Sequence, residues 1–472
     1  MARTVRQKTI SPVELVKAQL ERIERLNPLL NAFVELDADH ALLTARAAEA
    51  AVVQGRELGP LHGVPITIKS SIDVAGLRCE AGSRLRRGYV AGSDAPLVTR
   101  LKAAGAIVLG NTNVPDLLMA WETDNLIQGR TNNPWDLERT PGGSSGGESA
   151  AISACLSAAG VGSDGGGSIR VPAHFTGICG LKPTPGRIPC PGHFPPSAGP
   201  FAQLGVVGPM ARTVVDLKVL FEVMAGPDAG DPSAAPVPIR YLSAARTQGM
   251  RVGYFAEGRG TPATVETRAA VRSAVQALKQ SGFAVEPFQF DELEYARELW
   301  WVMFGLAGGW VLRPMIQGRE ANLHPILKEF VELVAAEPPL TLDRFMATLL
   351  ERDRVRTELL RQMENFPILL CPVCSVPAFR HRERSWPVDG KTVQYLEAMS
   401  YSQWVNILGL PAAVVPVAKS REGLPIGVQV VGRPWEEEVV LAVAAEIEGA
   451  CGGWQEPPVG CKSTREDPKV VN

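Results

Sequence analysis

The sequence predicts an α/β protein with a large mixed central β-sheet flanked by helices on both faces. Short β-rich runs alternate with helical runs along the chain, which is the pattern of α/β folds. The chain has 472 residues with 45% hydrophobic content, enough for a large buried core. It contains no internal repeat and no linker that would divide it, so we expect a single domain over residues 1–472.

Hydrophobic periodicity places the individual elements. A helix over 12–26 has apolar residues at helical spacing, with Ser11 as its N-cap and Pro12 at its first position. A second helix covers about 37–54. The expected strands are 64–68, 106–110, 250–254, 284–288, 368–376, 412–417 and 426–431, and the further helices are 95–104, 148–158 and 265–281.

Four other segments have a distinct composition. Glycine and proline are dense over 140–167 and 183–209, which predicts long functional loops with little regular structure. The segment 290–360 is helix-rich and is a candidate cover for a pocket. Its tryptophans and Phe304, together with Trp121, fit either a pocket wall or an ordinary core. Residues 453–472 are expected to form a polar C-terminal tail.

Charge and hydropathy argue against several classes of partner. The 48 Lys and Arg nearly balance the 50 Asp and Glu, without long blocks of one sign, so we expect neither nucleic acid nor a membrane as a partner. The longest apolar run, 299–312, is shorter than the roughly 20 residues that cross a bilayer and is interpreted as a buried helix or pocket wall. Residues 1–11 are polar and basic rather than signal-like, which predicts a cytoplasmic location.

The cysteines do not suggest a disulfide framework or a metal site. Eight of them are scattered over the chain, and the Cys-x-x-Cys pair at Cys371 and Cys374 has no second pair and no nearby histidine. A zinc site needs four ligands. We therefore expect no metal and no organic cofactor.

Two short glycine motifs are weak because their context is wrong. Residues 143–147 match Gly-x-Ser-x-Gly, which would make Ser145 a nucleophile, but asparagines and prolines precede them where a strand is required. Residues 160–165 match Gly-x-Gly-x-x-Gly, yet a dinucleotide site requires a strand before the motif and a helix after it. Both matches are expected to be accidental.

Ser168 is the candidate nucleophile because three glycines precede it. Gly165, Gly166 and Gly167 carry no Cβ, so their backbone N–H groups can converge on an oxyanion. A hydroxyl needs a base, and none of the six histidines has a triad context. A buried lysine of lowered pKa can replace histidine, and Lys69 at the end of an apolar strand fits that need. The alternative is a lysine that extends from the strand end to the surface.

Four motifs, in order, resemble the amidase signature family, and the similarity runs from about residue 11 to 448. They are Gly59-Pro-Leu-His-Gly-Val-Pro-Ile-Thr-Ile-Lys69, Thr140-Pro-Gly-Gly-Ser-Ser-Gly-Gly147, Gly162-Ser-Asp-Gly-Gly-Gly-Ser-Ile-Arg170 and Gly177-Ile-Cys-Gly-Leu-Lys-Pro-Thr184. The resemblance implies acyl transfer in which Lys69 is the base, Ser144 relays the proton through a cis peptide, and Ser168 attacks the carbonyl.

The same resemblance assigns further residues. Gly165, Gly166 and Gly167 would hold the oxyanion, and Ser145, Asp164 and Arg170 would brace the loop. A backbone carbonyl that lines the substrate site of one family member falls on Leu118. Two departures from the family pattern, Ser70 after the lysine and the small Gly165, suggest a roomier or differently shaped acyl pocket.

The predicted function is hydrolysis of bulky, apolar or aryl amides, with esters and carbamates as further small-molecule substrates. The main alternative is the glutamine-hydrolysing component of a tRNA-dependent amidotransferase, which works beside partner subunits. Its glutamine-binding aspartate aligns with Met399, and an apolar residue there argues against glutamine. A catalytically silent scaffold of the same fold is disfavoured by the three retained triad positions. A homodimer is left open.

Overall fold

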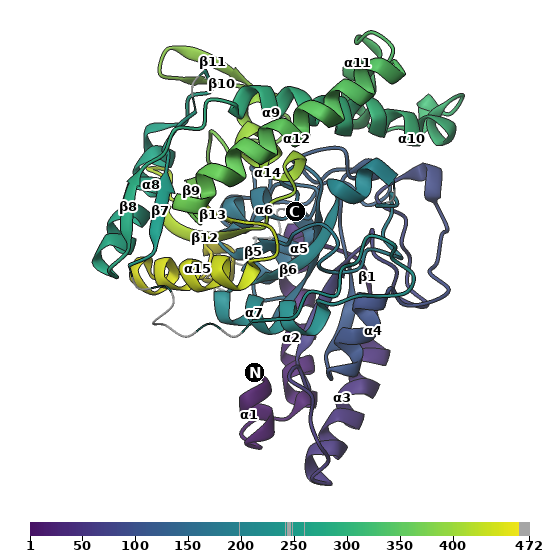
Figure 1. The fold of residues 1–472 in the computed structure, drawn as a ribbon. Helices are drawn as coiled ribbons and strands as arrows, with labels where there is room; N and C mark the ends of the chain where they lie inside the picture. Colours follow the sequence, from purple (N-terminus) through teal and green to yellow (C-terminus); the bar gives the residue numbers. More distant parts are fainter. Residues whose placement is uncertain (198, 241, 243–246, 248, 259, 462–472) are drawn as a thin grey trace, which may run out of the picture.

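An 11-stranded mixed sheet forms the centre of the molecule (Figure 1). The structure is a computed structural model, and it describes residues 1–472 apart from 198, 241, 243–246, 248, 259 and 462–472. In spatial order the strands are β1 (Phe33–Leu36), β3 (Ile107–Thr112), β2 (Pro65–Lys69), β4 (Ala159–Asp164), β6 (Val206–Ala211), β5 (Cys179–Lys182), β12 (Ala412–Lys419), β13 (Pro425–Gly432), β9 (Ile368–Pro372), β7 (Arg251–Tyr254) and β8 (Ala284–Pro287). A separate hairpin pairs β10 (Ser385–Val388) with β11 (Lys391–Gln394).

Strand direction makes the sheet mixed, as predicted. β2 runs parallel to both of its neighbours, β3 and β4, and β7 runs parallel to β8 and β9. The remaining pairs are antiparallel. β2 therefore lies inside the sheet with a strand on each side, and its last residue, Lys69, is held in the interior.

Helices cover both faces, which confirms the predicted fold class. Along β12, Ala413 and Val415 join one hydrophobic core while Ala412 and Val414 join another, because successive side chains point to opposite faces. The first core includes α4 (Pro96–Ala103), α7 (Val214–Met224), α8 (Val265–Gln280) and α15 (Glu437–Cys451). The second includes α6 (Arg170–Thr176), α9 (Leu293–Trp300), α12 (Leu342–Asn365) and α14 (Ser400–Ile407).

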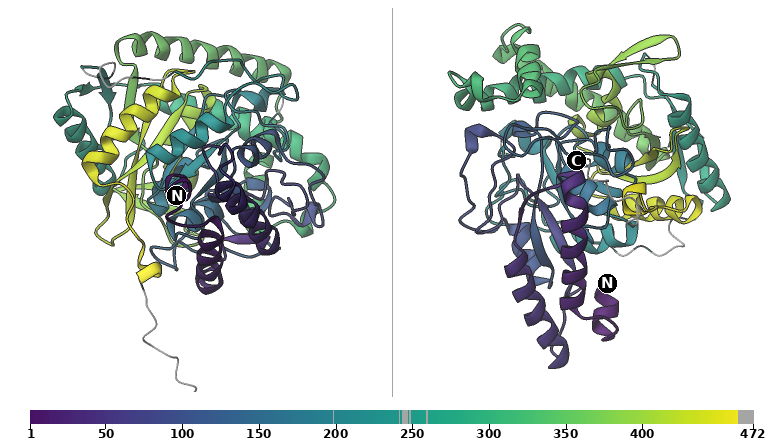
Figure 2. Two further views of the ribbon diagram at one scale, coloured as in Figure 1. Left: turned by 90° about the horizontal axis from the view of Figure 1, so that it is seen from below. Right: turned by 180° about the vertical axis from the view of Figure 1, so that it is seen from behind.

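The two ends of the molecule carry different helices (Figures 1 and 2). At one end α2 (Pro12–Leu30) and α3 (Ala38–Val53) pack with α5 (Gly146–Ser153) in a third core. At the other end α9 continues through a π-helical turn, Trp301–Leu306, into α10 (Ala307–Ile316) and is followed by α11 (Pro325–Ala335). The shorter helices are α1 (Ala2–Arg6), α13 (Tyr395–Ala398) and α16 (Pro458–Cys461).

The glycine-dense stretches are more regular than predicted. The segment 140–167 contains β4, which was not predicted, as well as α5, which overlaps the helix expected over 148–158, and the segment 183–209 leads into β6. The cause is close packing: a Cβ on Gly160 would lie 2.5 Å from the carbonyl oxygen of Thr67 on the neighbouring strand and would collide with the Glu148 carboxylate from α5. Glycine therefore marks a crowded strand here, and not an irregular backbone.

Two further expectations need adjustment. The predicted tail packs on the body as far as α16: Trp454 donates to the carbonyl oxygen of Ser153, and Val459 is buried. The rest of the tail, 462–472, lies outside the described residues. By length and composition alone, the helical stretch Leu293–Ile316 could cross a membrane, but half of its most apolar window is buried in the protein, which makes this weak evidence for a span.

Candidate functional site

Lys69 is completely buried and does not reach the surface from its strand end. Its Nζ lies 2.7 Å from the Ser144 Oγ and 2.9 Å from the Ser163 Oγ. Burial lowers the pKa of Lys69 to about 7, although the carboxylates of Asp164 and Glu148 act in the opposite direction. The amine is thus partly neutral at pH 7, and the surface interpretation of this lysine is wrong.

Ser144 lies in the loop that leads into α5, and the peptide bond between Gly143 and Ser144 is cis. The next residue ties this loop to the segment that contains Ser168, because the Ser145 N–H donates to the Ser168 carbonyl oxygen at 3.1 Å. Ser145 also donates its hydroxyl to the Ser163 carbonyl oxygen at 3.3 Å. Two loops distant in sequence are therefore joined at adjacent positions of the site.

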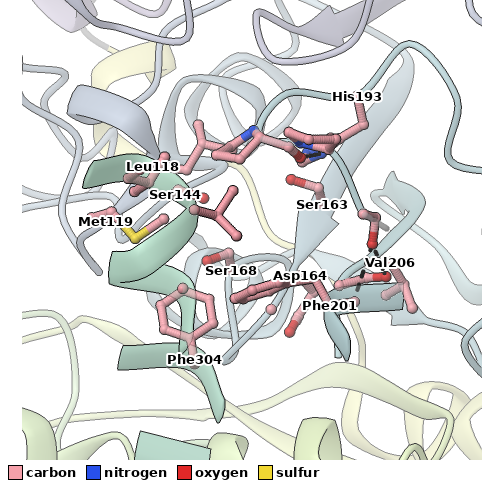
Figure 3. A pocket seen from close by; sticks show the side chains of 18 residues that line it. Leu118, Met119, Ser144, Ser163, Asp164, Ser168, His193, Phe201, Val206 and Phe304 are labelled. Atoms are coloured by element: carbon pink, nitrogen blue, oxygen red, sulfur yellow. Dashed lines mark hydrogen bonds between the residues drawn. The ribbon is translucent and has the colours of Figure 1, made fainter. Parts of the chain in front are cut away.

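Ser144 and Ser168 line one pocket (Figure 3). Within the part of the chain that the structure describes, no hydrogen bond joins their two hydroxyls, and the Ser168 side chain is only half-buried. The structure therefore brings Lys69 and Ser144 into contact and places Ser168 on the same cavity, where its hydroxyl is open to a ligand.

Two tryptophans hold the glycine run in place. The Trp300 Nε1 donates to the Gly165 carbonyl oxygen at 2.8 Å, and the Trp121 Nε1 donates to the Gly166 carbonyl oxygen at 2.9 Å. In a trans peptide the N–H points opposite to the C=O, so the Gly166 N–H faces away from Trp300. A Cβ on Gly166 would lie 2.6 Å from the Trp300 ring, which explains the glycine at that position.

Gly167 was expected to be an oxyanion donor, but its N–H group is not free as those of its neighbours are. Its N–H already donates to the Asp164 Oδ1 at 2.7 Å, so it is engaged within the loop. The N–H groups of Gly165, Gly166 and Ser168 have no protein acceptor among the described residues. Those three groups, and not Gly167, are the available donors.

Asp164 and Arg170 form a buried ion pair that fixes this loop. The guanidinium donates to both carboxylate oxygens at 3.0 Å, and neither side chain is exposed. Although burial alone raises the pKa of Asp164, the charge and hydrogen bonds of Arg170 hold it well below its usual value. Asn406 adds a further bond to the Asp164 Oδ1 at 3.0 Å, and Gln429 accepts from Arg170 at 3.0 Å.

Removal of Arg170 should strongly destabilise the fold. The Arg170→Met variant leaves the Asp164 carboxylate buried without its partner, which costs about 3–5 kcal/mol in comparable pairs. We expect a much lower melting temperature in differential scanning calorimetry. The matched control is Arg361→Met, because Arg361 pairs with Glu358 on the surface and both side chains are more than half exposed. An equally small effect in both variants would contradict the bracing role.

The pocket is mainly apolar. It encloses about 620 Å³ of space between atoms, part of it open to solvent. Apart from the serines, its walls come mostly from apolar residues of three segments, which are Leu118, Met119, Pro195, Pro196, Phe201, Val206, Phe304, Val311 and Leu312. Leu118, predicted to be at the substrate site, does line it, and its backbone is left-handed with φ of 66°.

Phe304 occupies the space that the small Gly165 leaves. A Cβ on Gly165 would lie 2.9 Å from the Phe304 ring, so the two residues are complementary. The pocket is therefore differently shaped rather than simply roomier. The cover helices take part directly, because Phe304, Gly308 and Leu312 are all lining residues.

Other residues of the aromatic cluster do not line this pocket. Trp300 is buried behind the glycine run, and Trp310 is 74% exposed. Met399 is fully buried in the second core and is not among the lining residues. The pocket wall therefore adds no support to the sequence argument from Met399 against glutamine.

Two polar residues near the site were not singled out from the sequence. Ser163 on β4 is a direct partner of Lys69. Glu148 on α5 accepts hydrogen bonds from Thr67 and Thr112, and burial raises its pKa to about 7. Ser163 stands in the third motif beside Asp164, but only the parallel pairing of β2 with β4 brings it to Lys69.

The residues of the site do not suggest a metal centre. Among the described residues, no group of three or more His, Cys, Asp or Glu is arranged to hold an ion. Cys371 and Cys374 are both buried, and burial raises the pKa of each thiol to about 12. Such thiols remain protonated and are poor ligands.

Comparison with known proteins places this geometry in a family. The family model described as Amidase matches residues 14–441. An indoleacetamide hydrolase of Bradyrhizobium diazoefficiens is 35% identical, over 96% of this chain and 86% of its own. A component of the glutamyl-tRNA(Gln) amidotransferase of Synechococcus sp. is 32% identical, over 98% of this chain and 94% of its own.

A solved structure agrees with the sequence relatives. A bacterial aryl acylamidase of the amidase signature family superposes with a TM-score of 0.86 at 27% identity, covering 98% of both chains. The chain therefore belongs to the amidase signature family, as its four motifs predicted, and it is an amidohydrolase of carbon–nitrogen bonds other than peptide bonds.

Proposed function

We propose that this enzyme hydrolyses apolar or aryl amides through an acyl-enzyme on Ser168, with Lys69 as the base and Ser144 as the proton relay. One observation carries the proposal: a fully buried lysine of lowered pKa bonds to Ser144 at the edge of an apolar pocket that also exposes the Ser168 hydroxyl. A desolvated lysine amine is an effective base near neutral pH.

Acylation begins with neutral Lys69. Ser144 passes its hydroxyl proton to the Lys69 Nζ and takes the proton of the Ser168 hydroxyl, whose oxygen attacks the substrate carbonyl. The negative charge on the carbonyl oxygen is stabilised by the N–H groups of Gly165, Gly166 and Ser168. The lysine, now an ammonium, returns a proton through Ser144 to the leaving nitrogen, and the C–N bond breaks to give an ester of Ser168.

Deacylation uses the same relay. A water molecule replaces the departed amine and gives a proton through Ser144 to Lys69 while its oxygen attacks the ester. The second tetrahedral intermediate collapses, the Ser168 oxygen regains a proton, and the carboxylic acid leaves. The rigid Asp164–Arg170 pair supports both steps because it holds the oxyanion loop in one shape.

The wall chemistry supports an apolar substrate over glutamine. Glutamine carries an ammonium and a carboxylate, and each needs an opposite charge when it is bound in a pocket. Among the lining residues the structure describes, Asp164 is the only charged side chain, and its carboxylate is already paired with Arg170. Phe304, Leu312 and Met119 instead offer surface to an aryl or alkyl group.

The relatives support an aryl substrate without deciding it. One relative is named for hydrolysis of indoleacetamide, and a structural neighbour is an aryl acylamidase. Another relative belongs to an amidotransferase, so glutamine hydrolysis beside partner subunits is the second candidate. Aryl esters and carbamates are included in the proposal, because they pass through the same acyl-enzyme chemistry.

A substrate panel tests the proposal. We expect kcat/KM for an anilide or an arylacetamide to exceed that for glutamine by about a hundredfold or more, since glutamine's charges would lie unpaired in the pocket. The panel comprises glutamine, an aliphatic amide, an anilide, an arylacetamide, an aryl ester and a carbamate. The Ser168→Ala protein gives the background from contaminating hydrolases. Preference for glutamine would establish the second candidate instead.

A further inference from the structure

One buried nitrogen in the pocket has no protein partner. The Nε2 of His193 is shielded from solvent, yet no group among the described residues forms a hydrogen bond with it. His193 lines the same cavity as Ser144 and Ser168. A buried polar atom left unpaired in a substrate pocket is costly unless a ligand pairs with it.

The tautomer of this ring follows from its other nitrogen. The Nδ1 of His193 lies 2.8 Å from the carbonyl oxygen of Pro195, which can only accept, so Nδ1 carries the hydrogen. Burial, reinforced by the positive charge of Lys69, lowers the pKa of His193 to about 4, and the ring is neutral at pH 7. The Nε2 therefore carries the lone pair and needs a hydrogen-bond donor. Because this atom is covered in the structure, the ring must turn slightly toward the cavity before a substrate can donate to it.

The position of His193 indicates which part of a substrate supplies that donor. Its loop is bonded to the segment that follows Lys69: the Phe194 N–H donates to the Ser71 carbonyl oxygen at 2.8 Å, and the Asp73 N–H donates to the Gly192 carbonyl oxygen at 2.9 Å. The histidine is thus built onto the side of the pocket from which the lysine reaches Ser144.

The apolar wall occupies the other side. In Figure 3, His193 and Ser163 lie across the cavity from Met119 and Phe304, with Ser144 between them. In the proposed mechanism the relay returns a proton to the leaving nitrogen, so that nitrogen must lie beside Ser144. The leaving group of the substrate is therefore the part that faces His193.

We propose that His193 is a specificity-determining residue whose Nε2 accepts a hydrogen bond from the N–H of the scissile amide and so favours amides over esters. The inference rests on the proposed function, because the relay fixes where the leaving nitrogen lies. An ester has an oxygen without hydrogen at that place and leaves Nε2 unpaired. The preferred substrates are thus primary or secondary amides with an apolar acyl or aryl group.

The test compares an amide and an ester of the same acid. We measure kcat/KM for the 4-nitroanilide and the 4-nitrophenyl ester in the wild type, in His193→Phe, which keeps a ring but has no acceptor, and in His193→Gln, whose carbonyl oxygen can replace Nε2. In His193→Phe we expect the anilide-to-ester ratio to fall about tenfold, with the ester rate within threefold of the wild type. His193→Gln should keep most of the ratio. Melting curves confirm that each variant is folded.

The outcomes of this experiment distinguish a failure of the His193 inference from a failure of the proposed function. An unchanged ratio in His193→Phe, equal losses for both substrates, or the same loss in His193→Gln as in His193→Phe would each overturn the role of His193. The proposed function would still stand in those cases, provided that the wild type turns over both substrates and Ser168→Ala does not. If the wild type hydrolyses neither, or Ser168→Ala hydrolyses both, the proposed function itself fails.

Discussion

Ser168→Ala should reduce kcat/KM for an anilide by about 10⁴-fold or more while the protein remains folded. The side chain is half-buried and makes no hydrogen bond to the described residues, so its hydroxyl can be removed with little effect on stability. The loss is large because the Ser168 hydroxyl is the attacking group in the proposed mechanism, and the methyl group of alanine cannot attack a carbonyl. Initial rates and a melting curve on the same preparation measure both quantities.

Ser197→Ala is the matched control for this variant. Ser197 lines the same pocket, but its hydroxyl donates to the Gly205 carbonyl oxygen at 2.8 Å and has no contact with Lys69 or Ser144. We expect its kcat/KM to stay within several-fold of the wild type. Acyl-enzyme detected by mass spectrometry after an acid quench should be present in Ser197→Ala and absent in Ser168→Ala. Normal turnover by Ser168→Ala would refute the assignment of the nucleophile.

Lys69→Met should lower kcat/KM on the order of 10³-fold, because the thioether fills similar space but cannot accept a proton. In the proposed mechanism only the neutral amine of Lys69 can accept the proton, and its pKa is about 7. Activity should therefore rise as the pH increases through about 7 and then level off, with a tenfold decrease per unit on the acid side. A pH series of kcat/KM with an uncharged anilide measures this limb.

Lys182→Met is the control for the general effect of replacing a buried lysine. Lys182 is also fully buried, and burial lowers its pKa to about 7, but its Nζ donates to the Pro183 carbonyl oxygen at 2.9 Å and it does not line the pocket. The folded Lys182→Met protein should keep the acid limb of the wild-type profile. If that limb disappeared in Lys182→Met and persisted in Lys69→Met, the base would not be Lys69.

Local pattern was enough to predict much of the fold. The apolar run of β2 and the helical periodicity of α8 are local patterns, which depend only on neighbouring residues. The observed bounds of both elements lie within one or two residues of the predicted ones. β4 was missed because its glycines satisfy a packing constraint set by β2 and α5, which no local pattern contains. Glycine in a crowded strand and glycine in a loop look alike in a sequence.

The site divides along the same line. Ser168 was predicted to be the nucleophile from its own glycine run, and this role stays a prediction. The contact between Lys69 and Ser144 joins residues far apart in the chain, and its prediction came only from the family resemblance. Pocket residues were harder to predict, because a helical period does not show which face of 301–312 looks into the cavity. Met399 shows the limit of alignment: its side chain packs in the core and has no place on the wall.

The contact between the helical turn at 300–306 and the glycine run limits which mutations can change the substrate preference of this enzyme. Within the turn Trp301–Leu306 and the residue before it, Phe304 shapes the cavity while Trp300 holds the Gly165 carbonyl. A mutation that moves the whole turn therefore has two effects together. It changes the pocket wall that selects the substrate, and it shifts the peptide groups of the glycine run that Trp300 holds. Broadening the substrate range without losing turnover therefore requires changes one or two helical turns after Phe304, at Gly308 or Leu312, which line the pocket and lie outside the turn next to Trp300.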